Sequence, residues 1–273
     1  MSVTTFAAAQ LLRLVPRVQV SRAVGRLCEM NLSPQVSGLA SRIYSRAYGV
    51  NLEEAEPQSS PYESFDAFFT RRLKPGARLV EQAPLVSPAD GQLLAKGPVV
   101  AGSEIRVKAQ NYRVAELIGD EEQAARYQGG QFAVVYLSPR DYHRVHSPVA
   151  GDIREVRSMG GDLYPVNAIG EQHVSGLFVR NQRVSVPIET ANHGRVTVVL
   201  VGATIVGRIT ITGLGQSSTP PGQHALSPAR RVEPGDEIGV FHLGSTAVLW
   251  VEAGLGIERD VGPIQYGQAL MRG

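Results

Sequence analysis

The chain has 273 residues, of which 43% are hydrophobic and 19% are charged, and its formal net charge is +2. This composition excludes a disordered or fibrous chain, and the length is sufficient for one large β-rich domain or two smaller ones. The single cysteine, Cys28, excludes an internal disulfide and is typical of a reducing compartment.

The first 50 residues are both basic and apolar. They contain six arginines and one acidic residue, Glu29, a net charge of +5, so the rest of the chain carries −3 of the total of +2. The longest apolar stretch, Val3 to Leu12, is interrupted at Arg13, well short of the roughly 20 apolar residues that a membrane-spanning helix needs. No positive charge precedes this stretch, so it is not typical of a signal peptide.

Two helices are predicted in this segment, over residues 4–30 with a break or kink at Pro16, and over residues 34–48. In the first helix, apolar residues recur at helical spacing and arginines occupy another face: Val20, Val24 and Leu27 against Arg22 and Arg26. Two interpretations are open. The helices pack on a core and expose a solvated basic face, or they form an arginine-rich amphipathic surface that lies on anionic lipid.

Residues 51–61 have the composition of a linker, and residues 62–69 predict a short helix. The basic run over residues 71–78 would be solvated surface in most proteins. It could also bind phosphate, because arginine offers a forked pair of donors to phosphate oxygens.

From about residue 85 the pattern changes to short β-branched runs separated by turn residues, with a helical interlude over residues 112–128. The predicted strands include residues 132–137, 183–186, 196–201, 238–241 and 247–251. The pattern S-P-x-x-G-x-[L/I] occurs at residues 87–93 and again at 147–153, and residues 233–241 add a similar turn and strand. We therefore predict an α+β fold, with N-terminal amphipathic helices followed by a β-rich, barrel-like sandwich domain.

Four places carry residues suited to chemistry: Asp90, the pair His143 and His146, Asn167, and Gly244-Ser245. A serine hydroxyl can attack the carbonyl of the residue before it if that peptide is strained and its oxyanion is stabilised. The attack converts the amide to an ester, and loss of the serine Cα proton then eliminates the ester and cuts the chain. The resulting dehydroalanine becomes an imine and hydrolyses to a pyruvoyl group.

This chemistry needs a base, which a neutral imidazole can supply. His143 and His146 follow a predicted strand, and in extended chain their side chains would face opposite sides and serve different sites. Asp90 could orient one of the imidazoles, as in Ser-His-Asp constellations. A structural role for either histidine remains open, and so does a metal site, although no further ligands occur at suitable spacing.

Several motifs follow one another in a fixed order: residues 87–91 (SPADG), 136–146 (YLSPRDYHRVH), 161–167 (GDLYPVN), 177–181 (LFVRN), 201–207 (VGATIVG) and 243–246 (LGST). In this order they resemble the phosphatidylserine decarboxylase family of bacterial and mitochondrial type. The similarity extends from residues 65–78 nearly to the C-terminus. Ala247 and Pro165 depart from the expected pattern, but neither replaces a reacting group.

The resemblance implies self-cleavage between Gly244 and Ser245, with Ser245 as nucleophile and then as precursor of a covalent pyruvoyl cofactor. His146 and Asp90 would complete the maturation triad, and His143 would donate a proton in the decarboxylation. No metal is implied.

The resemblance also implies the reaction. The enzyme would convert phosphatidylserine to phosphatidylethanolamine through a Schiff base between the pyruvoyl group and the substrate amine. The fragments, residues 1–244 and 245–273, would remain associated. Residues 1–60 would form a helical membrane-associating segment with a linker, and residues 61–273 the decarboxylase domain.

Several partners and alternatives follow. We expect an anionic membrane surface, a peripheral location on the cytoplasmic face of the inner membrane, a homodimer, and no nucleic acid. The turn units are also similar to those of barrel-sandwich phosphocarrier domains, in which a histidine carries phosphate on an intact chain. A non-catalytic membrane-binding homologue, or a decarboxylase for another amino-acid head group, would keep much of the same pattern.

Overall fold

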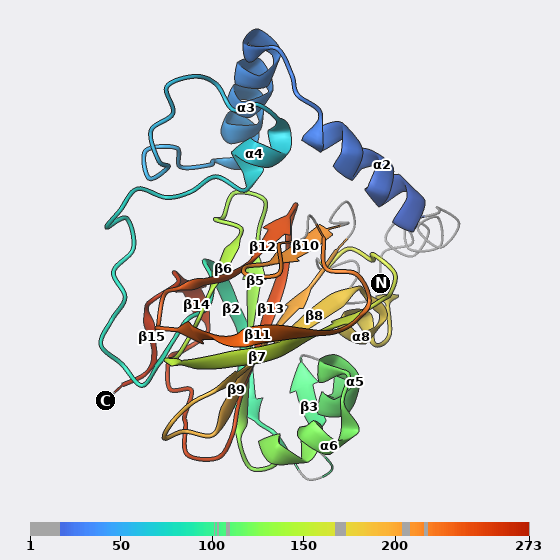
Figure 1. The fold of residues 1–273 in the computed structure, drawn as a ribbon, viewed down its shortest axis with the longest axis vertical. Helices are drawn as coiled ribbons and strands as arrows, with labels where there is room; N and C mark the ends of the chain where they lie inside the picture. Colours follow the sequence, from blue (N-terminus) through green and yellow to red (C-terminus); the bar gives the residue numbers. More distant parts are fainter. Residues whose placement is uncertain are drawn as a thin grey trace.

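An eight-stranded antiparallel sheet forms the centre of the structure (Figure 1). The structure is a computed structural model and describes residues 17–272 except 101, 103, 108–109, 167–172, 204–207 and 216–217. In spatial order the strands are β11 (Gly222–Val232), β7 (Gly151–Met159), β8 (Arg183–Glu189), β9 (Arg195–Val201), β13 (Ser245–Val251), β5 (Gln131–Leu137), β2 (Gly91–Pro98) and β14 (Gly262–Ile264).

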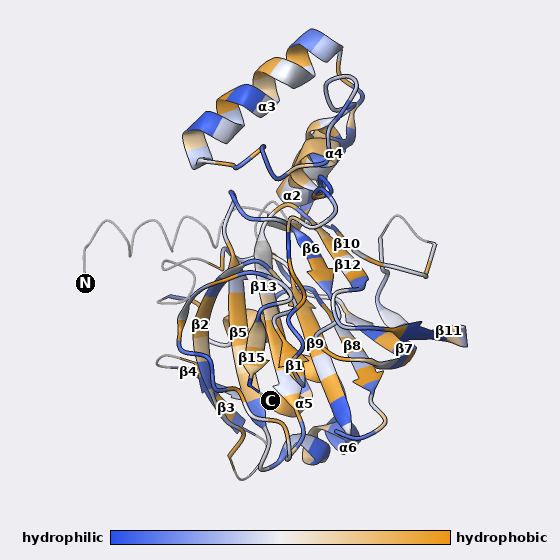
Figure 2. Cartoon of the chain, turned by 90° about the vertical axis from the view of Figure 1, so that its left-hand side faces the viewer, coloured by the Kyte–Doolittle hydropathy of each residue, from blue (hydrophilic) through white to orange (hydrophobic). Residues whose placement is uncertain are grey.

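The central strands are buried on both faces. In β13, Ala247, Leu249 and Val251 pack into one apolar cluster, whereas Val248 and Trp250 pack into a second one. Because successive side chains of a strand point to opposite faces, a sheet between two cores needs apolar residues at every position. This explains the continuous apolar runs of the predicted strands, which Figure 2 shows along β5 and β9.

Smaller elements cover the two faces. One cluster lies between the large sheet and two small antiparallel sheets: β10 (Arg208–Ile211) with β12 (Glu237–His242) and β6 (Arg144–His146), and β1 (Leu85–Val86) with β15 (Ala269–Met271). The other cluster includes residues of β3 (Glu104–Val107), β4 (Gln110–Arg113), α5 (Val114–Ile118), α6 (Glu121–Ala124), η1 (Ala125–Tyr127) and α8 (Leu177–Arg180). The predicted α+β, sandwich-like class is confirmed.

The N-terminal helices lie at one end of the sheet (Figure 1). They are α2 (Arg17–Glu29), α3 (Pro34–Tyr48) and α4 (Phe65–Phe69). α3 has the bounds predicted from the sequence, while the predicted break at Pro16 lies outside the described residues. In the part of the chain that the structure describes, no helix is long and apolar enough to span a membrane. The division into residues 1–60 and 61–273 stays a prediction.

The two serine–proline turns are structurally equivalent. In each, the serine hydroxyl donates to the carbonyl two residues on: Ser87 to Ala89 at 2.9 Å, and Ser147 to Val149 at 2.7 Å. Each serine also pairs through its backbone with a second turn, Ser87 with residues 267–268 and Ser147 with residues 235–236. The repeated sequence pattern therefore corresponds to a repeated unit of structure.

The strands around these turns repeat as well. β1 and β2 pair with β15 and β14, as β6 and β7 pair with β12 and β11. The two units bond to each other reciprocally, since His146 N–H donates to Pro88 O at 2.8 Å and Val86 N–H donates to Pro148 O at 3.0 Å. This pseudo-twofold arrangement places residue 146 of one unit beside residue 88 of the other.

Gly91 begins β2 where the backbones of two strands approach closely. A Cβ atom at Gly91 would lie 2.1 Å from Tyr136 O, whereas a Cβ at Gly262, on the adjacent strand, would meet nothing within 4 Å. The φ angles are similar, 148° and 144°. Only the steric contact distinguishes the two positions.

We therefore expect Gly91→Ala to lower the free energy of unfolding by at least about 2 kcal/mol more than Gly262→Ala, because both replacements share the backbone strain and only one displaces a strand. Urea unfolding of both variants in a Ser245→Ala background, which removes the predicted nucleophile of self-cleavage, measures the difference. Equal losses would show that β2 can move away from Tyr136 at little cost.

Candidate active site

The predicted site residues gather at one end of the large sheet. β5 ends where β2 and β13 begin, since Tyr136 is paired with Gln92 and Leu137 with Ser245. Neighbouring strands lie about 4.8 Å apart, so the starts of β2 and β13 are separated by roughly 10 Å. Asp90, the loop after Leu137 and the Gly244-Ser245 link therefore lie at the same end of the strands.

The backbone before the predicted cleavage site has an unusual conformation. Leu243 has φ 85° and is the one non-glycine residue with positive φ in the described part of the chain; Gly244 has φ 31°. The left-handed region costs a branched residue about 1–2 kcal/mol. The Leu243 side chain is buried in the same apolar cluster as Phe69, which holds the backbone in place. The structure thus places backbone strain directly before Gly244-Ser245.

His143 lies against the strand that leads to this link. Its carbonyl accepts a hydrogen bond from Phe241 N–H at 3.0 Å, and its ring packs on Phe69 with 4.1 Å between centroids. Its Nδ1 lies 2.8 Å from Asp141 O. Burial lowers the pKa of His143 to about 3; the bond to Asp141 opposes this shift and the charge of Arg71 reinforces it.

His146 is held in the same way on β6. Its Nδ1 lies 2.7 Å from Gly235 O, and its ring stacks on Tyr266 at 3.8 Å and, more distantly, on Tyr142 at 5.6 Å. Burial lowers the pKa of His146 to about 4, although the bond to Gly235 opposes the shift. His146 is therefore neutral near pH 7.

The hydrogen bonds define the tautomer of both rings. A carbonyl oxygen can only accept, so Nδ1 must carry the proton in each case and Nε2 of the neutral ring keeps its lone pair. Both Nε2 atoms are buried and have no hydrogen-bond partner among the described residues. Each histidine thus holds a buried basic nitrogen ready for a proton.

Asp90 is engaged elsewhere. Its carboxylate accepts from Arg78 Nη2 at 2.6 Å and Nε at 3.0 Å, and from Tyr266 N–H at 2.9 Å, while Arg78 also pairs with Glu54 at 2.8 Å. Burial raises the pKa of Asp90, and Arg78 and the Tyr266 N–H oppose the rise. No hydrogen bond links Asp90 to His146 in the described residues, so a direct pairing stays a prediction. Tyr266 contacts both.

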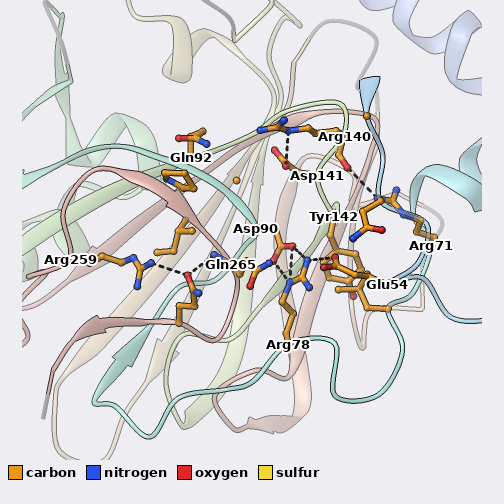
Figure 3. Close-up of a pocket in the computed structure, with 17 residues that line it drawn as sticks. Glu54, Arg71, Arg78, Asp90, Gln92, Arg140, Asp141, Tyr142, Arg259 and Gln265 are labelled. Carbon is orange, nitrogen blue, oxygen red and sulfur yellow. Dashed lines mark hydrogen bonds and ion pairs between the residues drawn. The ribbon is translucent and has the colours of Figure 1, made fainter. Parts of the chain in front are cut away.

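A cavity of about 420 Å³ opens beside Asp90 (Figure 3). Arg71, Arg78, Arg140 and Arg259 line it. Arg71 is buried, and its Nε has no hydrogen-bond partner. Among the described residues, no carboxylate forms an ion pair with Arg71. The basic run predicted over residues 71–78 is thus partly internal rather than solvated surface.

The sequence prediction missed Tyr266 and the conformation of Leu243, for which it contains no local signal. Asn167, which was singled out, lies outside the described residues. For Ser245, the predicted nucleophile, the structure describes the backbone. The described residues contain no cluster of metal-ligating side chains.

Comparisons with known proteins identify the family of the chain. The model of the phosphatidylserine decarboxylase family matches residues 65–272. Proteins named phosphatidylserine decarboxylase proenzyme are similar over most of the chain. One from Marinobacter nauticus is 40% identical over 250 residues (88% of this chain and 87% of that protein). One from Acinetobacter baumannii is 42% identical over 243 residues (88% and 85%), and one from Azotobacter vinelandii is 40% identical over 274 (94% and 94%).

These matches define the class of protein as a proenzyme-type decarboxylase. The chain belongs to the phosphatidylserine decarboxylase family.

The lowered pKa values of His143 and His146 predict how stability depends on pH. The unfolded rings have a pKa near 6.5, so between about pH 6.5 and 4 the unfolded chain binds protons that the folded chain excludes. The free energy of unfolding is then highest above pH 6.5 and falls with decreasing pH, by about 1.4 kcal/mol per pH unit for each ring. Urea unfolding of the Ser245→Ala chain between pH 7.5 and 4.5 measures this slope.

His143→Gln in the same background serves as the control. It removes the contribution of one of the two histidines to the pH dependence of the free energy of unfolding. The carboxylates contribute equally to this dependence in both chains. A slope unchanged by this replacement would show that His143 takes up its proton in the folded state.

Proposed function

We propose that the chain cleaves itself between Gly244 and Ser245 and then decarboxylates phosphatidylserine to phosphatidylethanolamine. The observation that carries the proposal is the positive φ of Leu243, a buried non-glycine residue directly before the link. It lies in a member of a family whose relatives are named proenzymes, at the end of β12 that bonds to His143, and both His143 and His146 have buried, unprotonated Nε2 atoms.

In the maturation step, we assign the attack on the Gly244 carbonyl to the Ser245 hydroxyl. His146 acts as the base, because its Nε2 is free to accept a proton and its ring is fixed by Gly235 O and by Tyr266. Asp90 supports it indirectly, since the carboxylate holds the Tyr266 N–H and thereby the ring that stacks on His146.

In the decarboxylation, His143 moves a proton. The substrate must lose a proton from its ammonium group before the amine can react, and a neutral Nε2 can accept it. The same nitrogen can then return the proton to the carbon that has lost carbon dioxide. Burial lowers the pKa of His143 to about 3, so a proton on this ring is readily given up to the carbon.

A pyruvoyl group would sit at residue 245, at the start of β13 and held by the pairing of this strand with β5 and β9. Such a group supplies an electrophilic carbonyl that withdraws the electron pair left by carbon dioxide. The residues fit it: the strained link favours its formation, and the buried Nε2 of His143, which has no partner among the described residues, lies in the chain that follows β5, the strand paired with β13. The fragments would remain joined by the strand pairing on both sides of the cut.

We also infer that α3 docks on the bilayer. This helix buries small polar side chains, Ser37 and Ser41, and exposes large apolar ones: Val36 is 53% exposed, Leu39 53% and Ile43 60%. The reverse arrangement would be normal for a soluble helix, and an outward apolar stripe suits the membrane interface. A homodimer and the cytoplasmic face of the inner membrane stay predictions from the resemblance.

We expect intact-mass spectrometry of the purified wild-type protein to show two fragments that part after Gly244, the shorter one blocked at its N-terminus. Ser245→Ala should give a single uncut chain, because the nucleophile is gone. His146→Ala should be cut at least about 100-fold more slowly, the loss typical of a missing general base.

His143→Ala provides the contrast. It should be cut like the wild type and yet release carbon dioxide from phosphatidylserine at least about 100-fold more slowly. A wild-type chain that stays whole would contradict the proposal. Equal effects of the two histidine variants on cleavage would contradict the division of roles.

Docking through α3 predicts that Leu39→Gln/Ile43→Gln lowers binding to phosphatidylserine-containing vesicles by about 10-fold or more, because two apolar side chains no longer leave water. Vesicle sedimentation measures the partition coefficient. The control is Leu79→Gln/Val261→Gln, which changes two apolar residues that are 81% and 59% exposed elsewhere. Equal losses in both pairs would contradict docking through α3.

A further inference from the structure

A second cavity lies between α2 and the strands that lead to the cleavage site. Its volume is about 410 Å³. Arg22 and Arg26 line it from α2, Arg208 from β10, and Leu243 from the end of the connection after β12. It is separate from the cavity beside Asp90, with which it shares no described lining residue.

Of the three arginines that line this cavity, only Arg208 forms ion pairs with described carboxylates. Arg208 Nη2 pairs with Asp66 at 2.7 Å and its Nε lies 3.3 Å from Glu29, so the two carboxylates of the cavity are both engaged with one arginine. Arg22 and Arg26 form no ion pair with any described residue and stand one helical turn apart. Three arginines against two carboxylates leave an excess of one positive charge, which matches a singly charged phosphodiester.

The cavity also lies close enough to residue 245 for one head group to extend between them. Leu243 lines it, and consecutive Cα atoms are 3.8 Å apart, so residue 245 lies within about 7.6 Å of Leu243. In phosphatidylserine, three covalent bonds separate the phosphorus from the carbon that carries the amine. A phosphate bound in the cavity would therefore leave the amine within reach of residue 245.

The α2 region also exposes large apolar side chains. Leu27 and Met30 of the α2 region are 61% and 55% exposed, and Val20 is 41% exposed. If these side chains enter the interface, arginines of the same helix lie at the depth of the phosphate groups, since their long stems let the guanidinium reach polar surroundings.

We propose that Arg22 and Arg26 form the phosphodiester subsite for the lipid substrate, and that Arg208, held by Asp66 and Glu29, forms the floor of this subsite. The assignment rests on the proposed decarboxylation. Arginine suits this role because its planar fork donates two hydrogen bonds to phosphate oxygens. The subsite places the serine head group between α2 and the start of β13.

The test compares Arg22→Gln/Arg26→Gln with Arg42→Gln/Arg46→Gln. The second pair removes the same charge at the same spacing from α3, and its residues line neither cavity. The substrate is dihexanoyl-phosphatidylserine below its critical micelle concentration, so membrane affinity does not enter. For the first pair we expect KM to rise at least about 10-fold with kcat changed less than about threefold, because binding to ground and transition states is lost equally. The second pair should stay within about twofold of the wild type.

A competition experiment identifies the ligand. Glycerophosphoserine should inhibit the wild-type enzyme, with an inhibition constant at least about 10-fold higher in Arg22→Gln/Arg26→Gln. Inorganic phosphate should compete at least about 10-fold more weakly than glycerophosphoserine. Equal competition by the two would assign the cavity to free phosphate and overturn the substrate subsite.

Self-cleavage separates this inference from the function on which it rests. Both pairs of variants should yield the two fragments as fully as the wild type. If the wild type is cut and active, and Arg22→Gln/Arg26→Gln behaves like Arg42→Gln/Arg46→Gln, the proposed subsite is overturned and the proposed decarboxylase activity is not. A wild type that is neither cut nor active would overturn the function itself.

Discussion

The site depends on the reciprocal backbone bonding of two serine–proline turns. His146 N–H donates to Pro88 O and Val86 N–H donates to Pro148 O, which locks two similar strand units together about a pseudo-twofold axis. At equivalent positions the units differ: residue 86 is Val where residue 146 is His, and residue 150 is Ala where residue 90 is Asp. The chemistry thus arises where two copies of one packing unit meet and their side chains have diverged. Tyr266 of the first unit completes the contact by stacking on His146 of the second.

Strand pairing then connects these turns to the Gly244-Ser245 link, the predicted cleavage site. β6 carries His146 and pairs with β12, whose chain continues through Leu243 to Gly244. Because β13 is held between β5 and β9, and β12 by β6 and β10, the two residues between β12 and β13 must make the change of direction alone. Leu243 takes the strained conformation, and burial of its side chain stabilises it. Strain at this point is therefore a consequence of the surrounding pairing, and it persists because both flanking strands are fixed.

The sequence predicts what local patterns control. The strands of residues 132–137 and 196–201 were found because a sheet buried on both faces needs unbroken apolar runs, and α3 was found from the proline at its start. The partners of Asp90 could not be found, because Arg78 and the Tyr266 N–H reach it from positions that only the fold brings together. The same holds for Leu243, whose φ results from pairing on either side rather than from its own preference, which is against that conformation.

The short helix α4 connects α3, the helix proposed to dock on the bilayer, to His143. In α4, Phe69 packs on the ring of His143, while Phe65 and Phe68 pack edge-on against Tyr44 of α3. Asp66 of the same helix binds Arg208 and lies 2.9 Å from Nδ1 of His242, next to Leu243 in the chain. The helix that exposes its apolar side chains and the buried histidine are thus separated by a single layer of aromatic rings. Because aromatic rings in a packed layer have little freedom to shift, α4 fixes the distance between His143 and α3, and docking of α3 on the bilayer, as proposed, would hold His143 at a fixed distance from the lipid.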